Sequence, residues 1–258
     1  MLTNYHTHHY RCLHATGEVV HYVEEAVKQG YDILGISCHM PYPDFKEMKH
    51  RMNYDEYEDY LRDIERADAA YPNIKVLKSL ECEYFPHLHD YYETLAKQTD
   101  YLVLGQHRFY YQGKLFYSFS ATKPEQLKAY GDSVEEAFAT GLFSIIAHPD
   151  GFGSSYQAWD EMCDEVTHQI VSAALKYNVV LELNANGFRR GKSQFKDGYR
   201  YQYPLNKFWD IVAKDYKEAR VIINSDCHDP KQLNDESVDQ ARRYAKEMNL
   251  NVIEVLPI

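Results

Sequence analysis

Histidine and carboxylate side chains recur in this sequence at positions where they could hold metal ions. The first two, His6 and His8, form a His-x-His pair near the amino terminus. In a β-strand, residues i and i+2 project from the same face, so both imidazoles would point to one place, as a metal site requires. A single pair of this kind more often consists of two ordinary surface histidines, so its interpretation depends on the rest of the chain.

Similar residues follow other short apolar runs along the chain. Together with residues 2–8, these runs cover residues 31–38, 75–80, 101–106, 142–147, 178–183 and 220–225. The polar residues at their ends are His6 and His8, His39, Glu81 and Glu83, His107, His148, Asn184 and Asn186, and Asp226 and His228. Mostly apolar runs of this length are typical of strands that are buried on both faces of a parallel sheet.

Helical segments separate the apolar runs. They are predicted over residues 18–29, 54–70, 88–98, 124–140, 156–177, 205–217 and 230–248, and a small closing strand is predicted over 251–256. Such alternation predicts an α/β protein with right-handed parallel βαβ units. For 258 residues without a Pro/Gly/Ser-rich linker we expect one domain, residues 1–258, closed as a (β/α) barrel. A doubly wound open sheet is the alternative.

The positions of the polar residues indicate the chemistry. In barrels and in open α/β sheets, active sites form at the C-terminal ends of the strands, which is where these residues lie. Imidazole and carboxylate together suit zinc, iron or manganese, whereas magnesium and calcium sites consist mostly of oxygen ligands. We therefore predict a multinuclear metal site in which Glu81 and Asp226 are the candidate bridging carboxylates.

Composition restricts the class of protein and its partners. The formal net charge of −11 disfavours nucleic acid or an anionic membrane as a partner. No apolar run approaches the roughly 20 residues of a membrane span, and the amino terminus lacks the pattern of a secretion signal, so we expect a cytoplasmic protein. Oligomeric state cannot be read from the sequence.

The five cysteines form no C-x-x-C pair. Neither a disulfide framework nor a thiolate zinc site is therefore expected. Cys38, Cys82 and Cys227 lie next to proposed ligands, and we expect them to be small buried strand residues that face away from the metal site.

The order of motifs resembles a known superfamily. H-T-H near the start, a His after the second strand, then E-C-E, G-Q-H, A-H-P and S-D-C-H look like the PHP (polymerase and histidinol phosphatase) metal-dependent phosphoesterases, over essentially the whole chain. L-G-Q-H-R and N-S-D-C-H-D-P resemble the histidinol-phosphate phosphatase branch. This resemblance implies a distorted, TIM-like (β/α)7 barrel of the PHP type with three divalent metal ions, zinc before iron or manganese.

The resemblance also implies ligand sets. The first metal would be held by His6, His8, Glu81 and Asp226, the second by Glu81, His107 and His148, and the third by His14, His39 and His228. His9 lies in the same loop as His14 and is the alternative ligand. The other histidines, His21, His50, His87, His89 and His168, are expected to be surface or structural residues.

The implied activity is that of a histidinol-phosphatase, which hydrolyses the small phosphomonoester L-histidinol phosphate in L-histidine biosynthesis. Close metal ions would activate a hydroxide for attack on phosphorus. Glu81, Asp226 and His228 would be the catalytic residues, and Asp226 or His228, or a water that they hold, would protonate the leaving alkoxide. The alternative is another PHP phosphoesterase that acts on nucleotides or single-stranded DNA ends.

Substrate contacts are expected from long loops on the catalytic face. Loops 40–53, 108–123 and 186–204 are expected to act as lids. The candidates for phosphate binding are Arg108, Arg189, Arg190, Lys192 and Arg200. Asn186, at the start of the third loop, is a further candidate for substrate binding. A substrate amine could meet Asp44, Glu47, Glu83 or Asp150.

Overall fold

The computed structural model describes residues 1–43 and 49–258, and a closed ring of parallel strands forms its centre. In chain order the ring contains β1 (Thr3–Asn4), β2 (Ile33–Ile36), β3 (Lys75–Lys78) continued by β4 (Glu81–Cys82), β5 (Val103–Leu104), β8 (Ile145–Ile146), β9 (Val180–Asn184) and β12 (Val221–Asn224). They pair in the orders β1-β2-β3 and β12-β9-β8-β5-β4. The seven runs predicted to be strands are thus confirmed.

Two junctions join these sheets into a barrel. At one, the chain continues from β3 into β4 through Ser79 and Leu80, and it changes its pairing from β2 to β5. At the other, β1 meets β12 through an isolated bridge between Thr7 and Cys227. The barrel is therefore closed but distorted, and the open sheet considered as the alternative is wrong.

Two buried asparagines take over the hydrogen bonding where β1 meets β12. Asn224 Oδ1 accepts a hydrogen bond from Tyr5 N at 2.8 Å, and Asn4 Oδ1 accepts one from Ser225 N at 2.6 Å. Each side chain reaches the main chain of the opposite segment, so the pair replaces backbone pairing. Buried backbone N–H groups need such partners, because an unpaired one is costly.

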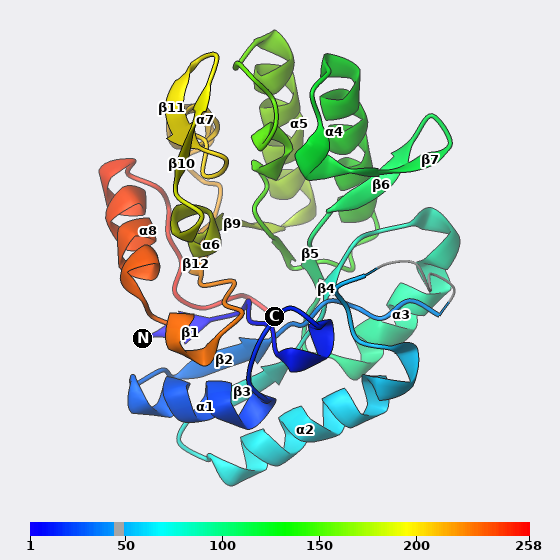
Figure 1. Ribbon diagram of the computed structural model, residues 1–258, viewed down its shortest axis with the longest axis vertical. Coiled ribbons are helices and arrows are strands. Elements are labelled where there is room, and N and C mark those ends of the chain that lie inside the picture. The colour runs from blue at the N-terminus through cyan, green and yellow to red at the C-terminus, as the bar shows by residue number, and fades with distance from the viewer. Residues whose placement is uncertain (44–48) are drawn as a thin grey trace.

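Long helices surround the strands of the barrel (Figure 1). They are α1 (Val19–Lys28), α2 (Tyr57–Ala70), α3 (His89–Gln98), α4 (Pro124–Ala139), α5 (Glu161–Tyr177), α7 (Asn206–Asp215) and α8 (Glu236–Glu247). All seven predicted helices are present, but two begin later than predicted. Asp160 and Asp235 cap α5 and α8 by accepting hydrogen bonds from backbone N–H groups, so each helix begins only after its cap.

The loops contain more structure than predicted. Loop 108–123 forms the hairpin β6 (Arg108–Tyr111) and β7 (Lys114–Tyr117), and its turn places Gln112 and Gly113 at φ 50° and 73°. Loop 186–204 contains most of α6 (Ala185–Arg189) and a second hairpin, β10 (Lys192–Phe195) and β11 (Gly198–Tyr201). Both hairpins stand out from the ring of helices (Figure 1). Two of the three predicted long loops therefore contain hairpins that were not predicted.

Short 3-10 turns complete the chain. They are η1 (Tyr10–Cys12), η2 (Tyr54–Glu56), η3 (Pro86–Leu88), η4 (Ser118–Ser120), η5 (Gly151–Gly153) and η6 (Pro230–Gln232). The predicted closing strand is reduced to a single bridge, Val252 to Val221, because the chain then turns to pack Leu256 under Tyr5. Over residues 1–43 and 49–258, none of the helices has both the length and the apolar character needed to cross a membrane.

The barrel interior has an apolar end and a polar end. Val180 and Ile222 belong to a small apolar cluster inside the strands, together with Val103 and Ile145. Along β9, every second residue after Val180 is polar, namely Glu182 and Asn184, and both are buried. The strands therefore carry their polar side chains towards their C-terminal ends, where the candidate site lies.

Replacing Asn224 with Leu should weaken the closure of the barrel. The substitution leaves Tyr5 N without its acceptor and removes the hydrogen bond from Asn224 Nδ2 to Glu182 Oε1. We expect the free energy of unfolding to fall by about 2–4 kcal/mol, since each buried group left unpaired costs roughly 1–3 kcal/mol. Urea denaturation in the presence of a chelator measures this loss without a contribution from metals. Asn251→Leu is the matched control, because its amide is exposed; an equal loss in both variants would contradict the role of Asn224.

Candidate metal centre

The carboxylate of Glu81 lies at the centre of the site. It projects from β4, is 2% exposed, and is surrounded by imidazoles. The nearest ring nitrogens are those of His6 at 3.5 Å, His8 at 3.5 Å, His39 at 2.9 Å, His107 at 3.4 Å and His148 at 3.3 Å. Three other strand ends and the first segment of the chain therefore converge on one carboxyl group.

Gly105 leaves the room that Glu81 occupies. A Cβ atom at residue 105 would lie 2.2 Å from Glu81 Oε1 and 2.6 Å from its Cγ and Cδ atoms. No side chain larger than hydrogen fits there unless Glu81 moves. The glycine of the G-Q-H motif thus has a direct steric function in the site.

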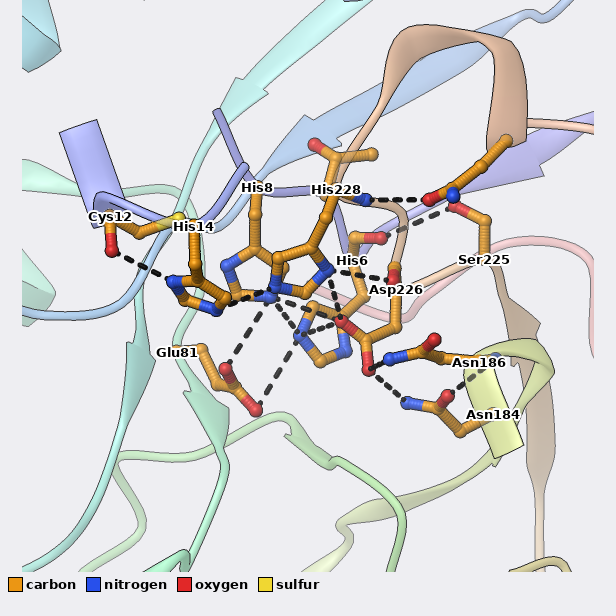
Figure 2. A network of polar contacts seen from close by, with 12 residues as sticks. His6, His8, Cys12, His14, Glu81, Asn184, Asn186, Ser225, Asp226 and His228 are labelled. Atoms are coloured by element: carbon orange, nitrogen blue, oxygen red, sulfur yellow. Dashed lines mark hydrogen bonds and ion pairs between the residues drawn. The ribbon is translucent and has the colours of Figure 1, made fainter. Parts of the chain in front are cut away.

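Asp226 is the second carboxylate, and its two oxygens have different surroundings. Oδ1 faces the histidines, at 3.1 Å from His8 Nε2 and 3.7 Å from His228 Nδ1. Oδ2 accepts hydrogen bonds from the amides of Asn184, at 3.0 Å, and Asn186, at 3.3 Å. The two asparagines fix the carboxylate and leave Oδ1 free to serve as a metal ligand (Figure 2).

Two of the strand-end residues have unusual backbone conformations. Asp226 and His148 have φ values of 44° and 34°, in the left-handed region. Non-glycine residues rarely adopt this region, and the strain is commonly found at functional sites. Here it turns both side chains into the barrel mouth at the point where each strand ends.

Glu182, a buried residue of β9, orients several of the ligands and was not predicted as a site residue. Its Oε1 lies 2.8 Å from His6 Nδ1, and its Oε2 accepts hydrogen bonds from His148 N at 3.1 Å and from Asn184 Nδ2 at 2.7 Å. A carboxylate on Nδ1 leaves Nε2 of His6 as the available ligand atom. An acidic residue inside an otherwise apolar strand was the signal that could have identified it.

The third group of predicted ligands lies at the edge of the site. His14 Nε2 and His228 Nε2 are 3.0 Å apart, and the His14 ring lies 5.2 Å from that of His39. Its Nδ1 is held 2.8 Å from Cys12 O, which aims Nε2 at His228. His9, the alternative to His14, is instead buried against the Tyr60 ring at 5.1 Å, away from this group.

Electrostatics of the site favour bound cations. Burial opposes ionisation of Glu81, but the imidazoles of His107, His6 and His39 outweigh it and hold the pKa of Glu81 well below its usual range. Burial lowers the pKa of His39 to about 4 and that of His228 to about 3, which keeps both rings neutral and their lone pairs available. The neighbouring carboxylates raise the pKa of His6 and His107, so these two rings release a proton when they bind an ion. Carboxylate and imidazole groups are the donors that zinc, iron and manganese accept.

Several sets of donor atoms are close enough to share an ion. Within each set the ligand atoms lie within 4.8 Å of one another; the sets are His6, His8 and Glu81; His39, Glu81 and His107; and His8, His39 and His228. Glu81 Oε2 and His8 Nδ1 are buried without a hydrogen-bond partner. Glu81 Oε2 instead faces the ring nitrogens of His39 at 2.9 Å and His8 at 3.5 Å, an arrangement that fits a metal ligand better than a structural residue.

A cavity of about 250 Å³ opens beside this cluster. Its walls include Arg108, Arg190, Tyr117, Phe119 and Tyr203, besides the histidines. The guanidinium carbons of Arg108 and Arg190 lie 5.5 Å and 5.7 Å from the ring centres of Tyr117 and Tyr203. No carboxylate of residues 1–43 or 49–258 lies within ion-pair distance of either arginine, so both can meet an anionic ligand.

Arg189 does not line this cavity, which corrects the sequence prediction. Its guanidinium pairs with Asp235 at 2.8 Å and donates to the carbonyl oxygens of Ser225 and Gln232. Lys192 and Arg200 also lie elsewhere, against Tyr201 and Phe195 respectively. Arg189 and Arg190 diverge because they lie at the end of α6, where consecutive side chains point about 100° apart.

The residues suggested for a substrate amine are already engaged or lie outside the described residues. Both oxygens of Glu83 accept hydrogen bonds from Arg51, at 3.1 Å and 3.3 Å. Asp150 Oδ2 accepts hydrogen bonds from Leu205 N and from the Trp209 indole. Asp44 and Glu47 fall in 44–48. By contrast, His50, which was expected to be a surface histidine, lines the cavity together with Lys49.

Comparison with known proteins agrees with this geometry. A model of the PHP domain family matches residues 4–186. A protein of Deinococcus radiodurans named "Probable histidinol-phosphatase" is 27% identical over 246 residues, which cover 90% of this chain and 88% of the relative. The DNA polymerase/3'-5' exonuclease PolX of Bacillus subtilis is 23% identical over 213 residues, which cover 82% of this chain but only 32% of that protein.

A solved structure shares the fold. Histidinol phosphate phosphatase of Lactococcus lactis, in a complex with zinc, L-histidinol and phosphate, superimposes with a TM-score of 0.73 at 17% identity. The match covers 98% of this chain and 95% of that chain. It supports the distorted barrel derived above from strand order.

Gly105→Ala should lower the metal content of the protein. The new methyl group must displace the Glu81 carboxylate, and we expect the affinity for divalent metal to fall by roughly 10–100-fold, as for other losses of ligand support. Metal analysis after dialysis against a weak chelator measures this. Gly141→Ala is the control: its φ of 71° makes the substitution strained, but nothing lies near it. A Gly105→Ala protein that retains wild-type metal content would contradict the proposed centre.

Proposed function

The chain belongs to the PHP domain family, and on that basis we propose that it is a histidinol-phosphatase. It hydrolyses L-histidinol phosphate to L-histidinol and phosphate, as a cytoplasmic enzyme of L-histidine biosynthesis. Its partner is a small phosphomonoester, not nucleic acid or a membrane. The named relative and the solved structure support this choice of substrate, because each match covers most of both chains.

One observation carries this proposal. A carboxylate surrounded by imidazoles, Glu81, lies in the wall of the same small cavity as two arginines that have no acidic partner among the described residues. The first feature is a site for cations, and the second is a site for an anion such as phosphate. Their combination in one cavity is what a metal-dependent phosphatase requires.

We assign three divalent metal ions, most favourably zinc, to this centre. His6, His8, Glu81 and Asp226 would hold the first, Glu81, His107 and His148 the second, and His14, His39 and His228 the third. When bound, such ions lower the pKa of a coordinated water and withdraw charge from phosphoryl oxygens. Glu182, Asn184 and Asn186 keep the protein ligands in their orientation before substrate arrives.

The arginines and the residues at the mouth of the cavity are assigned to substrate binding and to protonation of the leaving group. Arg108 and Arg190 bind phosphoryl oxygens, and their planar guanidinium groups can each donate two hydrogen bonds. Asn186 donates to Asp226 Oδ2 at 3.3 Å and also lines the cavity, so its amide belongs to the proposed substrate site. Asp226 and His228 lie next to each other at the mouth. Burial lowers the pKa of His228 to about 3, and the nearby imidazoles hold the pKa of Asp226 well below its usual range, so both are unprotonated near neutral pH. A water that they hold therefore supplies the proton that the leaving alkoxide takes up.

Cavity size and lining favour a small substrate. A volume of about 250 Å³ is slightly below the roughly 300–1,000 Å³ of most ligand pockets, and it suits a small molecule with a single phosphate. Phe119 and Tyr203, whose ring centres are 5.5 Å apart, offer aromatic faces to an imidazole. A polynucleotide would need a basic track, which a chain with a net charge of −11 does not supply easily. The PHP resemblance to PolX nevertheless keeps nucleotides and DNA ends as the alternative to be tested.

The functional unit extends beyond the segment that the family model matches. The match ends at residue 186, but Asp226 and His228 follow β12. Asp226 Oδ1 lies 3.1 Å from His8 Nε2, and His228 Nε2 lies 3.0 Å from His14 Nε2, so both belong to the proposed metal centre together with residues of the amino-terminal segment. We therefore take the whole chain, residues 1–258, as one phosphatase domain.

A comparison of substrates tests the proposal. Zinc-loaded protein should release phosphate from L-histidinol phosphate faster than from a mononucleotide, and it should not shorten single-stranded DNA. His107→Ala should reduce turnover at least roughly 100-fold, because loss of even an outer partner of a ligand costs 10–100-fold. His168→Ala, on the face of α5, should leave turnover unchanged. Faster hydrolysis of the nucleotide or of DNA would replace the proposal with its alternative.

Arg108→Ala and Arg190→Ala test the assignment of phosphate contacts. Each removes one positive charge from the cavity, and we expect kcat/KM for L-histidinol phosphate to fall about 10²–10³-fold, as when one preorganised donor is removed from an active site. Lys192→Ala is the control from the same region of the chain, since Lys192 lies outside the cavity. Equal effects of Lys192→Ala and Arg190→Ala would show that general charge, and not a specific contact, is responsible.

A further inference from the structure

A cysteine lies among the outer histidines of the metal centre. Cys12 is the last residue of η1, is fully buried, and belongs to the loop that carries His14. The ligand atoms of Cys12, His14 and His228 lie within 4.8 Å of one another. Figure 2 shows Cys12 beside His14, on the side of the cluster opposite Asn184 and Asn186. Cys12 was not among the ligands predicted from the sequence.

A second, independent feature points to the same place. His8 is 1% exposed and its Nδ1 has no hydrogen-bond partner, while its Nε2 faces Asp226 at 3.1 Å. His8, Cys12 and Cys38 also form a set whose ligand atoms lie within 4.8 Å of one another. The side of His8 that does not face the carboxylates thus has an unpaired polar atom and two sulfur atoms close by.

The spacing is compatible with a shared tetrahedral ion. With bond lengths of 2.0–2.1 Å to nitrogen and 2.3 Å to sulfur, ligand atoms on one zinc are about 3.3–3.8 Å apart. His14 Nε2 and His228 Nε2 are already 3.0 Å apart, and Cys12 lies within 4.8 Å of this pair. The limit of 4.8 Å exceeds this range by about 1 Å, so side-chain movement of that order would bring all three donors to the same ion.

We propose that Cys12 is a thiolate ligand of the third metal position, next to His14 and His228. This assignment rests on the proposed phosphatase centre and adds a donor to it. On binding, the Cys12 S–H bond breaks, sulfur forms a bond to the divalent ion, and the proton leaves to solvent. No change of oxidation state is involved.

Cys38 has a different function from Cys12. Its thiol donates a hydrogen bond to His9 O at 3.8 Å, so it is engaged as a thiol. It supports the Cys12 loop from the end of β2 and is not the ligand. This also corrects the expectation that Cys38 faces wholly away from the metal site, whereas Cys82 keeps an ordinary contact with Leu80 O.

A thiolate makes the third position chemically different from the other two. The donors around Glu81 are nitrogen and oxygen, which manganese and iron accept as readily as zinc. Sulfur is a soft donor that favours zinc and disfavours manganese. The third position should therefore keep zinc even when manganese occupies the other two.

Cobalt substitution of the full chain tests this directly. A thiolate bound to Co²⁺ gives a near-ultraviolet charge-transfer band, which nitrogen and oxygen donors do not. The wild-type protein should show the band when the third equivalent of cobalt binds. Cys12→Ser should lose it and bind its third zinc roughly 10–100-fold more weakly. Cys38→Ser and the remote control Cys163→Ala, in α5, should retain the band.

The outcomes separate this inference from the proposed activity. Absence of the band in the wild-type protein, or its persistence in Cys12→Ser, overturns the inference. A count of three reactive thiols in the denatured wild-type protein, in place of five, would also overturn it, since Cys12 and Cys38 would then form a disulfide. Phosphate release from L-histidinol phosphate is measured on the same zinc-loaded samples. A band without turnover supports Cys12 and contradicts the phosphatase, and turnover without a band does the reverse.

Discussion

The burial of carboxylates at the mouth of the barrel is the constraint on which this structure depends. Glu81, Asp226 and Glu182 are each at most 5% exposed, and their charges cannot remain there without compensation. Glu182 obtains it from hydrogen bonds, through His6, Asn184, Asn224 and the amide of His148. Glu81 and Asp226 face mainly imidazoles. An imidazole compensates the buried negative charge fully only when it carries a proton or when both groups bind the same metal ion. A site of this kind costs free energy until a cation binds, so its retention in the core indicates function.

The same constraint explains how the barrel closes. Asp226 and His228 follow β12, whereas His6 and His8 follow β1, so the site needs both ends of the chain side by side. Regular pairing between β1 and β12 is limited to one bridge, and Asn4 and Asn224 cross the gap instead. Asn224 holds Tyr5 N with its oxygen and Glu182 with its nitrogen. One side chain thereby couples closure of the barrel to the orientation of His6.

The fold and most of the centre could be predicted because burial and position leave a direct signal. Apolar runs ending in His or Glu mark strand ends, and all strand ends of a parallel barrel lie on one face. What could not be predicted depends on local geometry. Arg189 and Arg190 are indistinguishable until α6 turns one to Asp235 and the other to the cavity. Likewise, only the course of η1 decides between His9 and His14, and it also brings Cys12 to the cluster.

The proposed metal ligands and the proposed substrate contacts come from different kinds of element, and this has a consequence for specificity. The donors around Glu81 follow short buried strands whose register is fixed by the barrel, so their positions can change little. Arg108 and Arg190 instead lie at the bases of segments that lead into the two hairpins, one at the start of β6 and the other after α6. Tyr117, which contacts Arg108, lies at the end of β7. A change in a hairpin can therefore reshape the cavity without disturbing the cluster. Sequence changes in the hairpins should therefore alter which substrate is bound. Changes at the strand ends should alter the ability to cleave a phosphate ester.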